Sequence, residues 1–326
     1  MRDEPDDISC DLVSGFLSEH WGFHAAEVTY APVGFGSCHW IASDADGPRW
    51  FVTADRLDPH GHWLGSTAGQ LKGAIEAATQ TTMELADRGY EFVVPPLPDR
   101  TGLLAREMLP GWMVVVLPYL QGWSTPDGAW DDPAERAQIA GILGRLHVAT
   151  PPKALQRWEF AVPGRDALLD ALANLDRPWS SGPYAEPTRR RLAGALEHVH
   201  DRLAHYDSLV REVEASDDPW VVTHGEPHSA NVVRTTDGLR LIDWDTVQLA
   251  PRERDLAAVL GGPADVLPAY QAEAGPVTPR PAAMELFEVW WSLAEIAEYA
   301  NLFRNPHHDS EDSAESWRNL TMYVPG

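Results

Sequence analysis

The stretch Val222-Thr-His-Gly-Glu-Pro-His-Ser-Ala-Asn231, followed closely by Leu241-Ile-Asp-Trp-Asp245, concentrates acids and an amide in a short segment. Gly225 and Pro227 interrupt any periodic pattern, so the first part of this segment is expected to form a loop. After the loop, apolar residues on both sides of an Asp-Gly turn predict a β-hairpin over residues 232–242.

A hairpin of this size brings its two ends together, so Glu226, Asn231 and Asp243 are expected to converge on one point. Transfer of a γ-phosphoryl group requires a carboxylate that orients the acceptor. It also requires oxygen ligands for the magnesium ions that neutralise charge on the phosphates. The pattern therefore predicts a site of the kind that phosphoryl transfer uses.

The spacing from Glu226 to Asn231 and the later Ile-Asp-Trp-Asp resemble the catalytic and metal motifs of the aminoglycoside phosphotransferase family, which shares the protein-kinase fold. The resemblance implies that Glu226 is the catalytic base, Asn231 the second metal ligand and Asp243 the principal metal ligand. Asp245 is a weaker candidate, as a metal ligand or as support for one. His228, in the same loop, is assigned to acceptor binding.

The family usually carries Asp at the position of Glu226, although members of an actinobacterial type read His-Gly-Glu-Pro-His, as this chain does. The extra methylene moves the carboxylate by about 1.5 Å. A misplacement of about 1 Å can reduce the rate on the order of a hundredfold. We therefore expect the loop backbone to be set back so that Glu226 can work.

Residues 30–40, Tyr-Ala-Pro-Val-Gly-Phe-Gly-Ser-Cys-His-Trp, are typical of a strand, a glycine loop and a second strand, and residues 44–47 are typical of a hairpin turn. This segment resembles the nucleotide loop of the kinase fold. Gly34 and Gly36 allow the backbone to approach phosphates, and Ser37 can donate a hydrogen bond to them.

The strand after this turn carries Thr53 where the family has a lysine that holds the α- and β-phosphates. The chain contains only two lysines, Lys72 and Lys153. We expect Arg56 or Lys72 to replace the missing lysine, Arg49 being a further possibility, unless magnesium alone neutralises the phosphates.

A β-branched strand that ends at Pro118 predicts a hinge at residues 118–122, between a nucleotide-binding lobe at 1–117 and a catalytic and acceptor-binding lobe at 118–326. Tyr119 and Leu120 are the candidates to present backbone groups to the nucleotide base. A plain strand ending in a turn remains the alternative. The predicted fold is a bilobal, protein-kinase-like α+β fold, with an antiparallel sheet plus a helix in the small lobe and a mostly helical large lobe.

A long helix is predicted from Pro281 to Phe303. One interpretation is that this helix forms a wall of the acceptor site, with acids meeting amines and a tryptophan stacking on a ring. The other is that its aromatic residues only pack the large lobe. The candidates for acceptor binding are Trp290, Trp291, Glu295 and Glu298. Asp255, after the metal motif, is expected to support the catalytic loop.

Composition sets wider limits on function. The chain has 326 residues, 44% apolar content and a formal net charge of −24, which disfavours nucleic-acid partners and slightly favours a cationic acceptor. The two cysteines show no metal-binding or disulfide spacing, and no apolar run is long enough to span a membrane. We therefore expect a cytoplasmic enzyme with no membrane partner, as a monomer or homodimer.

The expected reaction moves the γ-phosphate of ATP or GTP, with Mg²⁺, to a hydroxyl of a small molecule. An antibiotic, whether aminoglycoside-like, a basic peptide or a nucleoside, is the first interpretation, and phosphorylation would then give resistance. An ordinary metabolite such as choline, a sugar or a nucleoside is the alternative acceptor. A pseudokinase that binds nucleotide without turnover is the alternative from another class, since the strand lysine is missing.

Overall fold

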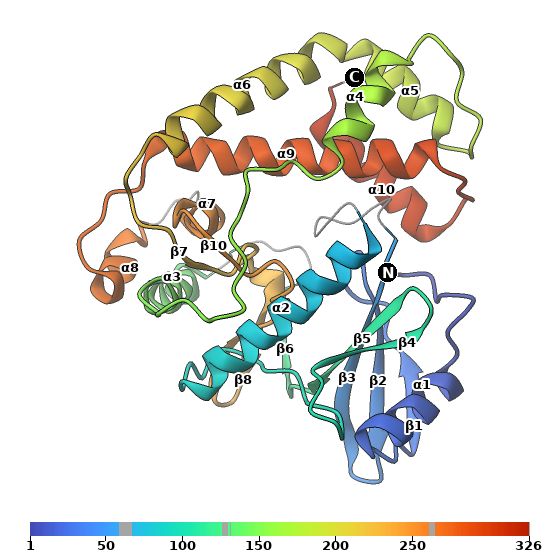
Figure 1. The fold of residues 1–326 in the computed structure, drawn as a ribbon, viewed down its shortest axis with the longest axis vertical. Helices are drawn as coiled ribbons and strands as arrows, with labels where there is room; N and C mark the ends of the chain where they lie inside the picture. Colours follow the sequence, from blue (N-terminus) through green and yellow to red (C-terminus); the bar gives the residue numbers. More distant parts are fainter. Residues whose placement is uncertain (59–66, 126–129, 131, 261–264, 326) are drawn as a thin grey trace.

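The N-terminal part of the protein is built around a five-stranded antiparallel sheet with the strand order β1-β2-β3-β5-β4 (Figure 1). The computed structural model describes residues 1–58, 67–125, 130, 132–260 and 265–325. The predicted turn at residues 44–47 is confirmed, because Asp44 pairs with Gly47 where β2 meets β3. The strands are β1 (Glu27–Tyr30), β2 (Cys38–Asp44), β3 (Gly47–Arg56), β4 (Ala105–Leu109) and β5 (Trp112–Pro118).

The two faces of this sheet pack against different helices. On one face, Val52 and Ala54 of β3 join a cluster with residues of α1 (Cys10–Phe16) and the π-helix η1 (Leu17–Trp21). On the other face, α2 (Ala68–Asp87) packs Ile75 against Met113 and Val115 of β5. These two β5 residues pair with Asp55 and Thr53 of β3, so both β3 side chains lie on the α2 face.

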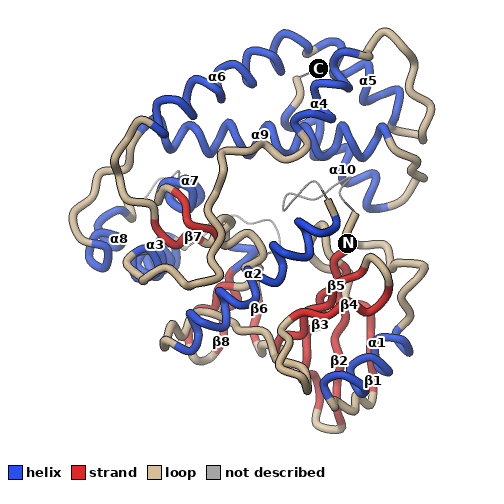
Figure 2. The backbone as a smooth tube through the Cα atoms, viewed as in Figure 1, coloured by secondary structure: helices blue, strands red, loops and turns tan. Residues whose placement is uncertain are grey.

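The C-terminal part is mostly helical and contains two small sheets, as the colouring of Figure 2 shows. The sheets have the orders β10-β7 and β6-β8-β9. The elements are β6 (Gly122–Trp123), α3 (Pro133–His147), α4 (Arg165–Ala173), α5 (Ala185–Gly194), α6 (Leu196–Glu214), β7 (Val221–Thr223), the 3-10 helix η2 (Ser229–Asn231), β8 (Val232–Thr235), β9 (Gly238–Leu241), β10 (Gln248–Ala250), α7 (Glu253–Leu260), α8 (Leu267–Ala274), α9 (Pro281–Arg304) and α10 (Glu311–Tyr323).

Helix α9 is the centre of the C-terminal core, with α4 and α6 packed along it (Figure 1). Its residues from Ser292 to Ala297 are all buried. Six consecutive residues cover more than one helical turn, so every side of this segment is covered by other parts of the protein. The bounds of α9 confirm the helix predicted over residues 281–303.

The predicted bilobal α+β fold is confirmed by this division into a sheet-rich part and a helical part. Strand β5 ends at Pro118, at the start of the predicted hinge, and the exact lobe boundary stays a prediction. Among the described residues, no helix is both long enough and apolar enough to cross a bilayer.

Candidate active site

The loop that carries Glu226 connects β7 to η2, and the β8–β9 hairpin follows it directly. At the base of the hairpin the N–H of Ile242 donates to the carbonyl of Asn231 over 3.0 Å. This hydrogen bond places Asp243, the next residue, beside Asn231. The convergence expected from the hairpin is therefore present.

The side chain of Asn231 is held by the loop itself. Its Nδ2 donates to the backbone carbonyl of Glu226 over 3.0 Å, which leaves Oδ1 available as a ligand. His228 lies between the two residues, with its Nε2 3.4 Å from Asn231 Nδ2 and 3.8 Å from Glu226 Oε2. The Nδ1 atom of His228 is buried and makes no hydrogen bond within the described part of the chain.

His224 fixes the backbone just before Glu226. Its Nε2 donates to the carbonyl of Ile242 over 2.9 Å, and its Nδ1 accepts the N–H of Glu226 over 3.3 Å. Burial lowers the pKa of His224 to about 4, so the ring is neutral at physiological pH. A neutral ring is the form that can donate from one nitrogen and accept at the other.

Asp255, which lies in the first turn of α7, accepts hydrogen bonds from the backbone of the same loop. Its carboxylate accepts the N–H groups of His224 at 2.8 Å and Gly225 at 2.7 Å, and it contacts Nε2 of His147 at 3.0 Å. Burial alone would raise the pKa of Asp255, but the hydrogen bond with His147 and the neighbouring charge of Arg254 hold it below its usual value. The supporting role predicted for Asp255 is confirmed.

Gly225 allows this arrangement because its backbone is left-handed, with φ of +104°. A Cβ atom at this position would lie 2.5–2.6 Å from side-chain atoms of Arg254 and Thr246. Arg254 donates to Thr223 Oγ1 and to the carbonyl of Thr246, and Thr246 Oγ1 donates to the carbonyl of His224. At Gly225 the loop is thus closely packed against Arg254 and Thr246.

Two acids stand at the end of the hairpin, and both are surrounded by protein groups although their side chains reach solvent. Burial, followed by the charges of Glu226 and Asp55, raises the pKa of Asp243 to about 7. Burial and the charge of Asp243 raise the pKa of Asp245 well above its usual value. Asp243 also has a φ of +66°, a costly conformation for a residue with a side chain that is often found at functional sites.

The glycine loop faces this group of acids from the N-terminal sheet. Gly34 and Gly36 both have left-handed φ values, +69° and +88°. Ser37 donates to Asp55 over 2.5 Å, so its hydroxyl points to the α2 face of the sheet. Thr53 lies on the same face and contacts His39 Nδ1 over 3.2 Å. The nucleotide contacts predicted for Gly34, Gly36 and Ser37 stay predictions.

The two proposed substitutes for the missing lysine are placed differently. Arg56 pairs with Asp7 at 3.2 Å and stacks on Trp112 at 5.1 Å, in the cluster that covers the α1 face. The assignment of Arg56 to the nucleotide site is therefore wrong, because alternation along β3 turns its side chain to the opposite face from Asp55. Lys72 is half-exposed in the first turn of α2, 3.9 Å from Glu76, and its assignment stays a prediction.

Arg49, the further possibility, pairs with Asp44 and Asp46 at the β2–β3 turn. In the predicted hinge, the N–H of Tyr119 donates to the carbonyl of Arg49 over 2.9 Å and extends the sheet. Tyr119 can therefore offer a nucleotide base its carbonyl but not its N–H. The backbone contact predicted for Leu120 stays a prediction.

The predicted acceptor residues of α9 fall into two groups. Trp290 is buried in the C-terminal core, where its indole N–H donates to the carbonyl of Ala161 over 2.7 Å, so the prediction that it stacks on an acceptor is wrong. Trp291 donates to the hydroxyl of Tyr323 over 3.0 Å and packs against the same core. For these two residues the packing interpretation holds.

Glu295, in contrast, lies near the catalytic loop although it is only 8% exposed. Burial raises the pKa of Glu295 to about 7; a hydrogen bond with Tyr299 opposes this increase, and the charge of Glu226 adds to it. Glu298 is half-buried one residue before Tyr299. Glu295 and Glu298 remain the candidates on α9 for contact with an acceptor.

Two residues near the site were not predicted from the sequence. Asp55 contributes to the raised pKa of both Asp243 and Asp245, so it lies close to the C-terminal acids. Phe35, at the tip of the glycine loop, packs edge-on against Tyr299 of α9, with ring centroids 6.2 Å apart. Strand alternation from Thr53 would have indicated Asp55, whereas no sequence signal indicated the contact of Phe35.

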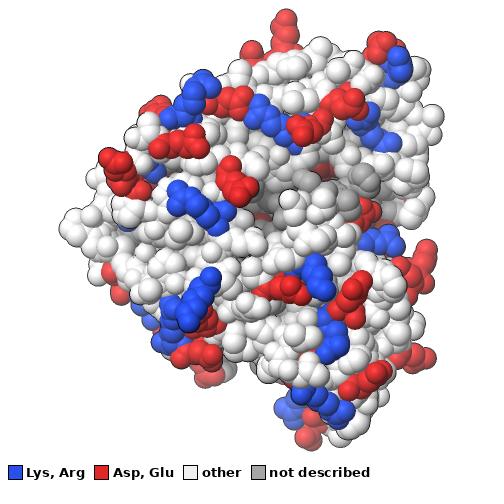
Figure 3. All heavy atoms as spheres, in the orientation of Figure 1, with Lys and Arg blue, Asp and Glu red and all other residues white. Residues whose placement is uncertain are grey.

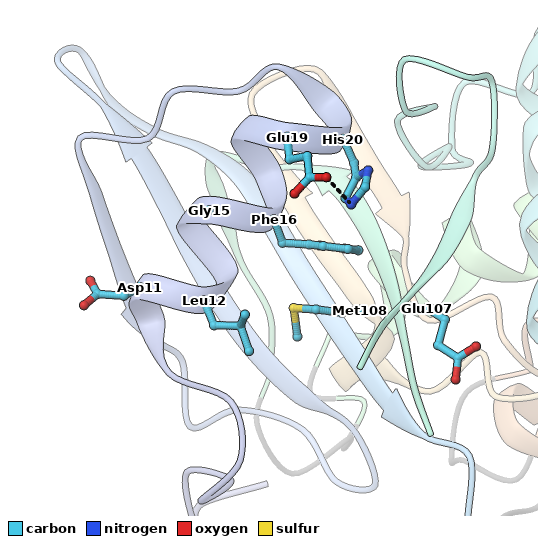
Figure 4. Close-up of a pocket in the computed structure, with 8 residues that line it drawn as sticks. All are labelled: Asp11, Leu12, Gly15, Phe16, Glu19, His20, Glu107 and Met108. Atoms are coloured by element: carbon cyan, nitrogen blue, oxygen red, sulfur yellow. Dashed lines mark ion pairs between the residues drawn. The ribbon is translucent and has the colours of Figure 1, made fainter. Parts of the chain in front are cut away.

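Other surface features lie outside this site. A hollow of about 380 Å³ lies between α1 and β4, where Leu12 and Phe16 face Met108 and His20 pairs with Glu19 (Figure 4). It contains none of the predicted site residues. On the face drawn in Figure 3, basic and acidic side chains are interspersed. The net negative charge is therefore not concentrated on that face.

A model of the phosphotransferase enzyme family matches residues 39–287, which include most of β2, the hinge and the residues Glu226, Asn231, Asp243 and Asp245. The chain belongs to this family. Protein StrN of Streptomyces griseus is 30% identical over 276 residues, which cover 81% of each chain. This phosphotransferase thus has a relative that matches it over most of its length.

Solved structures show the same fold at lower identity. A spectinomycin phosphotransferase in complex with ADP and spectinomycin aligns with a TM-score of 0.74, at 16% identity and over 97% of this chain and 95% of that one. An amicoumacin kinase bound to AMP-PNP and Ca²⁺ gives 0.59, at 14% identity over 98% and 93%. A type I macrolide 2'-phosphotransferase gives 0.56, at 19% identity over 95% and 96%. The phosphotransferase described here therefore has their kinase-like fold.

Proposed function

We propose that this phosphotransferase moves the γ-phosphate of ATP or GTP to a hydroxyl group of an antibiotic. The observation that carries the proposal is the arrangement of Glu226, Asn231 and Asp243 on one loop and hairpin, with Asn231 hydrogen-bonded to the backbone of Glu226. This arrangement supplies a carboxylate that can orient the acceptor and oxygen ligands for magnesium, both of which phosphoryl transfer requires.

The donor atoms near Asp243 fit Mg²⁺, which prefers carboxylate and amide oxygens. The Oδ1 atom of Asn231 takes no part in the hydrogen bond that Nδ2 makes, and the carboxylates of Asp243 and Asp245 repel one another. A divalent cation held by Asn231, Asp243 and Asp245 would relieve this repulsion and neutralise charge on the nucleotide phosphates. Among the described residues, no group of three His, Cys, Asp or Glu side chains is arranged as a metal site. We therefore infer that nucleotide oxygens complete the ligand set.

Glu226 has the position to orient the acceptor hydroxyl and take its proton. The acceptor oxygen then forms a bond to the γ-phosphorus, the bond from that phosphorus to the β,γ-bridging oxygen breaks, and the nucleoside diphosphate leaves. His224 and Asp255 hold the loop backbone in place while this occurs. The Nδ1 atom of His228, which has no hydrogen-bond partner among the described residues, offers a polar contact to the acceptor beside the reacting hydroxyl.

The proposal of an antibiotic acceptor is supported by what similar proteins bind. The aligned structures include enzymes for spectinomycin and macrolides, and a third was solved with kanamycin and GDP. A cationic acceptor is also supported by Glu295, a buried acid near Glu226 that an ammonium group would stabilise in its charged form. Phosphorylation of a hydroxyl that the antibiotic needs for binding would then give resistance in the cytoplasm, where nucleotide and magnesium are available.

A screen of antibiotics with labelled ATP and GTP tests the proposal, with mass spectrometry to locate the added phosphate. The screen should include choline, amino alcohols, sugars and nucleosides, since an aminopropanol kinase also shares the fold. Transfer to a metabolite but to no antibiotic would replace the proposed acceptor class. Magnesium-dependent thermal stabilisation by nucleotide without any transfer would support the pseudokinase alternative. Sedimentation in the same buffer distinguishes a monomer from a homodimer.

A further inference from the structure

The first three residues of the chain lie between the N-terminal sheet and α10, as the position of the N-terminus in Figure 1 shows. The backbone N–H groups of Arg2 and Asp3 donate to the two carboxylate oxygens of Asp312, over 2.7 and 3.0 Å. Asp312 belongs to the first turn of α10, so these hydrogen bonds join residues about 310 positions apart in the sequence.

The same segment also binds the glycine loop. Arg2 Nη1 donates to the carbonyl of Pro32 over 3.0 Å, and the hydroxyl of Tyr30 donates to the carbonyls of Met1 and Asp3, both over 2.9 Å. The amino group of Met1 donates to three carbonyls of the glycine loop, of residues 33, 34 and 37. Residues 1–3 therefore connect the glycine loop to α10.

Asp312 is suited to hold this connection because it is only 6% exposed. A buried carboxylate is stable only when it is hydrogen-bonded, and here each oxygen accepts one N–H of the N-terminal segment. Displacing the segment would leave that carboxylate without these hydrogen bonds, at a considerable cost in free energy. Phe35 provides a second contact between the glycine loop and the C-terminal helices, through Tyr299, whose hydroxyl accepts from Asn319 of α10 over 3.2 Å.

We propose that Asp312 is a positioning residue for nucleotide binding, which holds the glycine loop in place through the backbone of residues 1–3. The inference rests on the proposed function for the identity of the ligand. In a chain that has Thr53 in place of the strand lysine, a glycine loop held in advance lowers the entropy lost when the loop closes on phosphates. Asp312 itself does not touch the nucleotide.

Asp312→Asn tests the proposal because it keeps the shape of the side chain but can accept only one of the two N–H groups. Hydrogen exchange of the amides of residues 31–38 should become several-fold faster, and the KM for nucleotide should rise about tenfold with a small change in kcat. Glu311→Gln is the matched control, since it removes one exposed charge from the same helical turn. Glu311→Gln should change neither the exchange rates of residues 31–38 nor the KM for nucleotide.

Arg2→Ala provides a second variant if Asp312→Asn unfolds, because it removes the contacts with Pro32 and Glu315 from a half-exposed position. It should change exchange and KM in the same direction by a smaller factor. Unchanged exchange of residues 31–38 in a folded Asp312→Asn protein would overturn the proposal. So would an equal change in Glu311→Gln, which would indicate a general effect of helix charge.

The exchange measurement also separates this inference from the proposed reaction. It requires no turnover, so a protein that transfers phosphate to no acceptor still shows whether Asp312 controls the glycine loop. Magnesium-dependent binding of a non-hydrolysable ATP analogue then replaces KM as the second measurement.

Discussion

The side-chain amide of Asn231 donates to the backbone carbonyl of Glu226, and the two residues are thereby fixed relative to each other. Asn231 is the predicted metal ligand, and Glu226 is the predicted base. A loop held in this way keeps the reacting groups in position before substrates bind, which is where much of the rate enhancement in phosphoryl transfer arises.

Glu226→Gln should lower kcat by about 10²–10⁴, because the amide keeps the shape of the side chain but cannot take the acceptor proton. The KM for nucleotide should change little, since Glu226 faces the acceptor. Single-turnover measurements with the identified acceptor check both values. Glu226→Asp should also be slower than the native enzyme. Asp255 and Asn231 hold the loop backbone fixed, so the shorter side chain places its carboxylate farther from the acceptor hydroxyl. Native turnover in the Gln variant would remove Glu226 from the mechanism.

Asp243→Asn should abolish transfer and, without metal, should stabilise the protein at neutral to alkaline pH. The pKa of Asp243 is about 7 in the folded state and about 3.8 as a free side chain. Between these values the folded state keeps a proton that the unfolded state has lost, so the contribution of Asp243 to the free energy of unfolding falls as pH rises. The Asn variant has no carboxylate to ionise at this position, so its free energy of unfolding does not fall for this reason as pH rises.

Urea unfolding of the native and Asp243→Asn proteins across this pH range, in chelator and in Mg²⁺, checks the prediction. The difference in the free energy of unfolding should increase up to about pH 7 in chelator and then level off. Magnesium should stabilise the native protein and have little effect on the variant. A difference independent of pH would show that Asp243 is ionised throughout.

Arg56→Ala should leave the KM for nucleotide unchanged within about twofold and should reduce stability slightly, because its partners Asp7 and Trp112 lie on the α1 face. Lys72→Ala should raise that KM if Lys72 supplies the charge that the strand lacks. Steady-state kinetics with ATP and with GTP separate the two residues. A large increase for Arg56→Ala would require the side chain to leave its observed position.

Glu295→Gln should weaken binding of a cationic acceptor roughly tenfold or more, since a hydrogen bond to a charged group is lost. The acceptor KM of the native enzyme should fall as pH rises through about 7, because Glu295 then ionises. The variant should lose this pH dependence. Glu288→Gln, an exposed acid on the same helix, is the control. An unchanged acceptor KM in Glu295→Gln would place the amine elsewhere.

The catalytic loop could be predicted from the sequence because its geometry is local. The distance from Glu226 to Asn231 is five residues, and a two-stranded hairpin determines where Asp243 lies. The glycine loop and its turn were predictable for the same reason.

Other features depend on contacts between distant segments. Whether Arg56 or Asp55 lies on the face that carries the site depends on which side of β3 receives α2, and a shift of one residue reverses the answer. Trp290 could not be distinguished from Glu295 as an acceptor residue, because α9 is surrounded by protein and its periodicity marks no single buried face. The contact between Asp312 and the first residues joins the two ends of the sequence, beyond any local pattern.

We expect the contact between Phe35 and Tyr299 to link the binding of the two proposed substrates thermodynamically. Phe35 belongs to the loop predicted to cover the nucleotide, and Tyr299 is hydrogen-bonded to Glu295, a candidate for the acceptor site. A nucleotide that shifts Phe35 would change the surroundings of Tyr299, and we expect the affinity for the acceptor to change with them. By reciprocity, the acceptor must change the affinity for the nucleotide by the same factor.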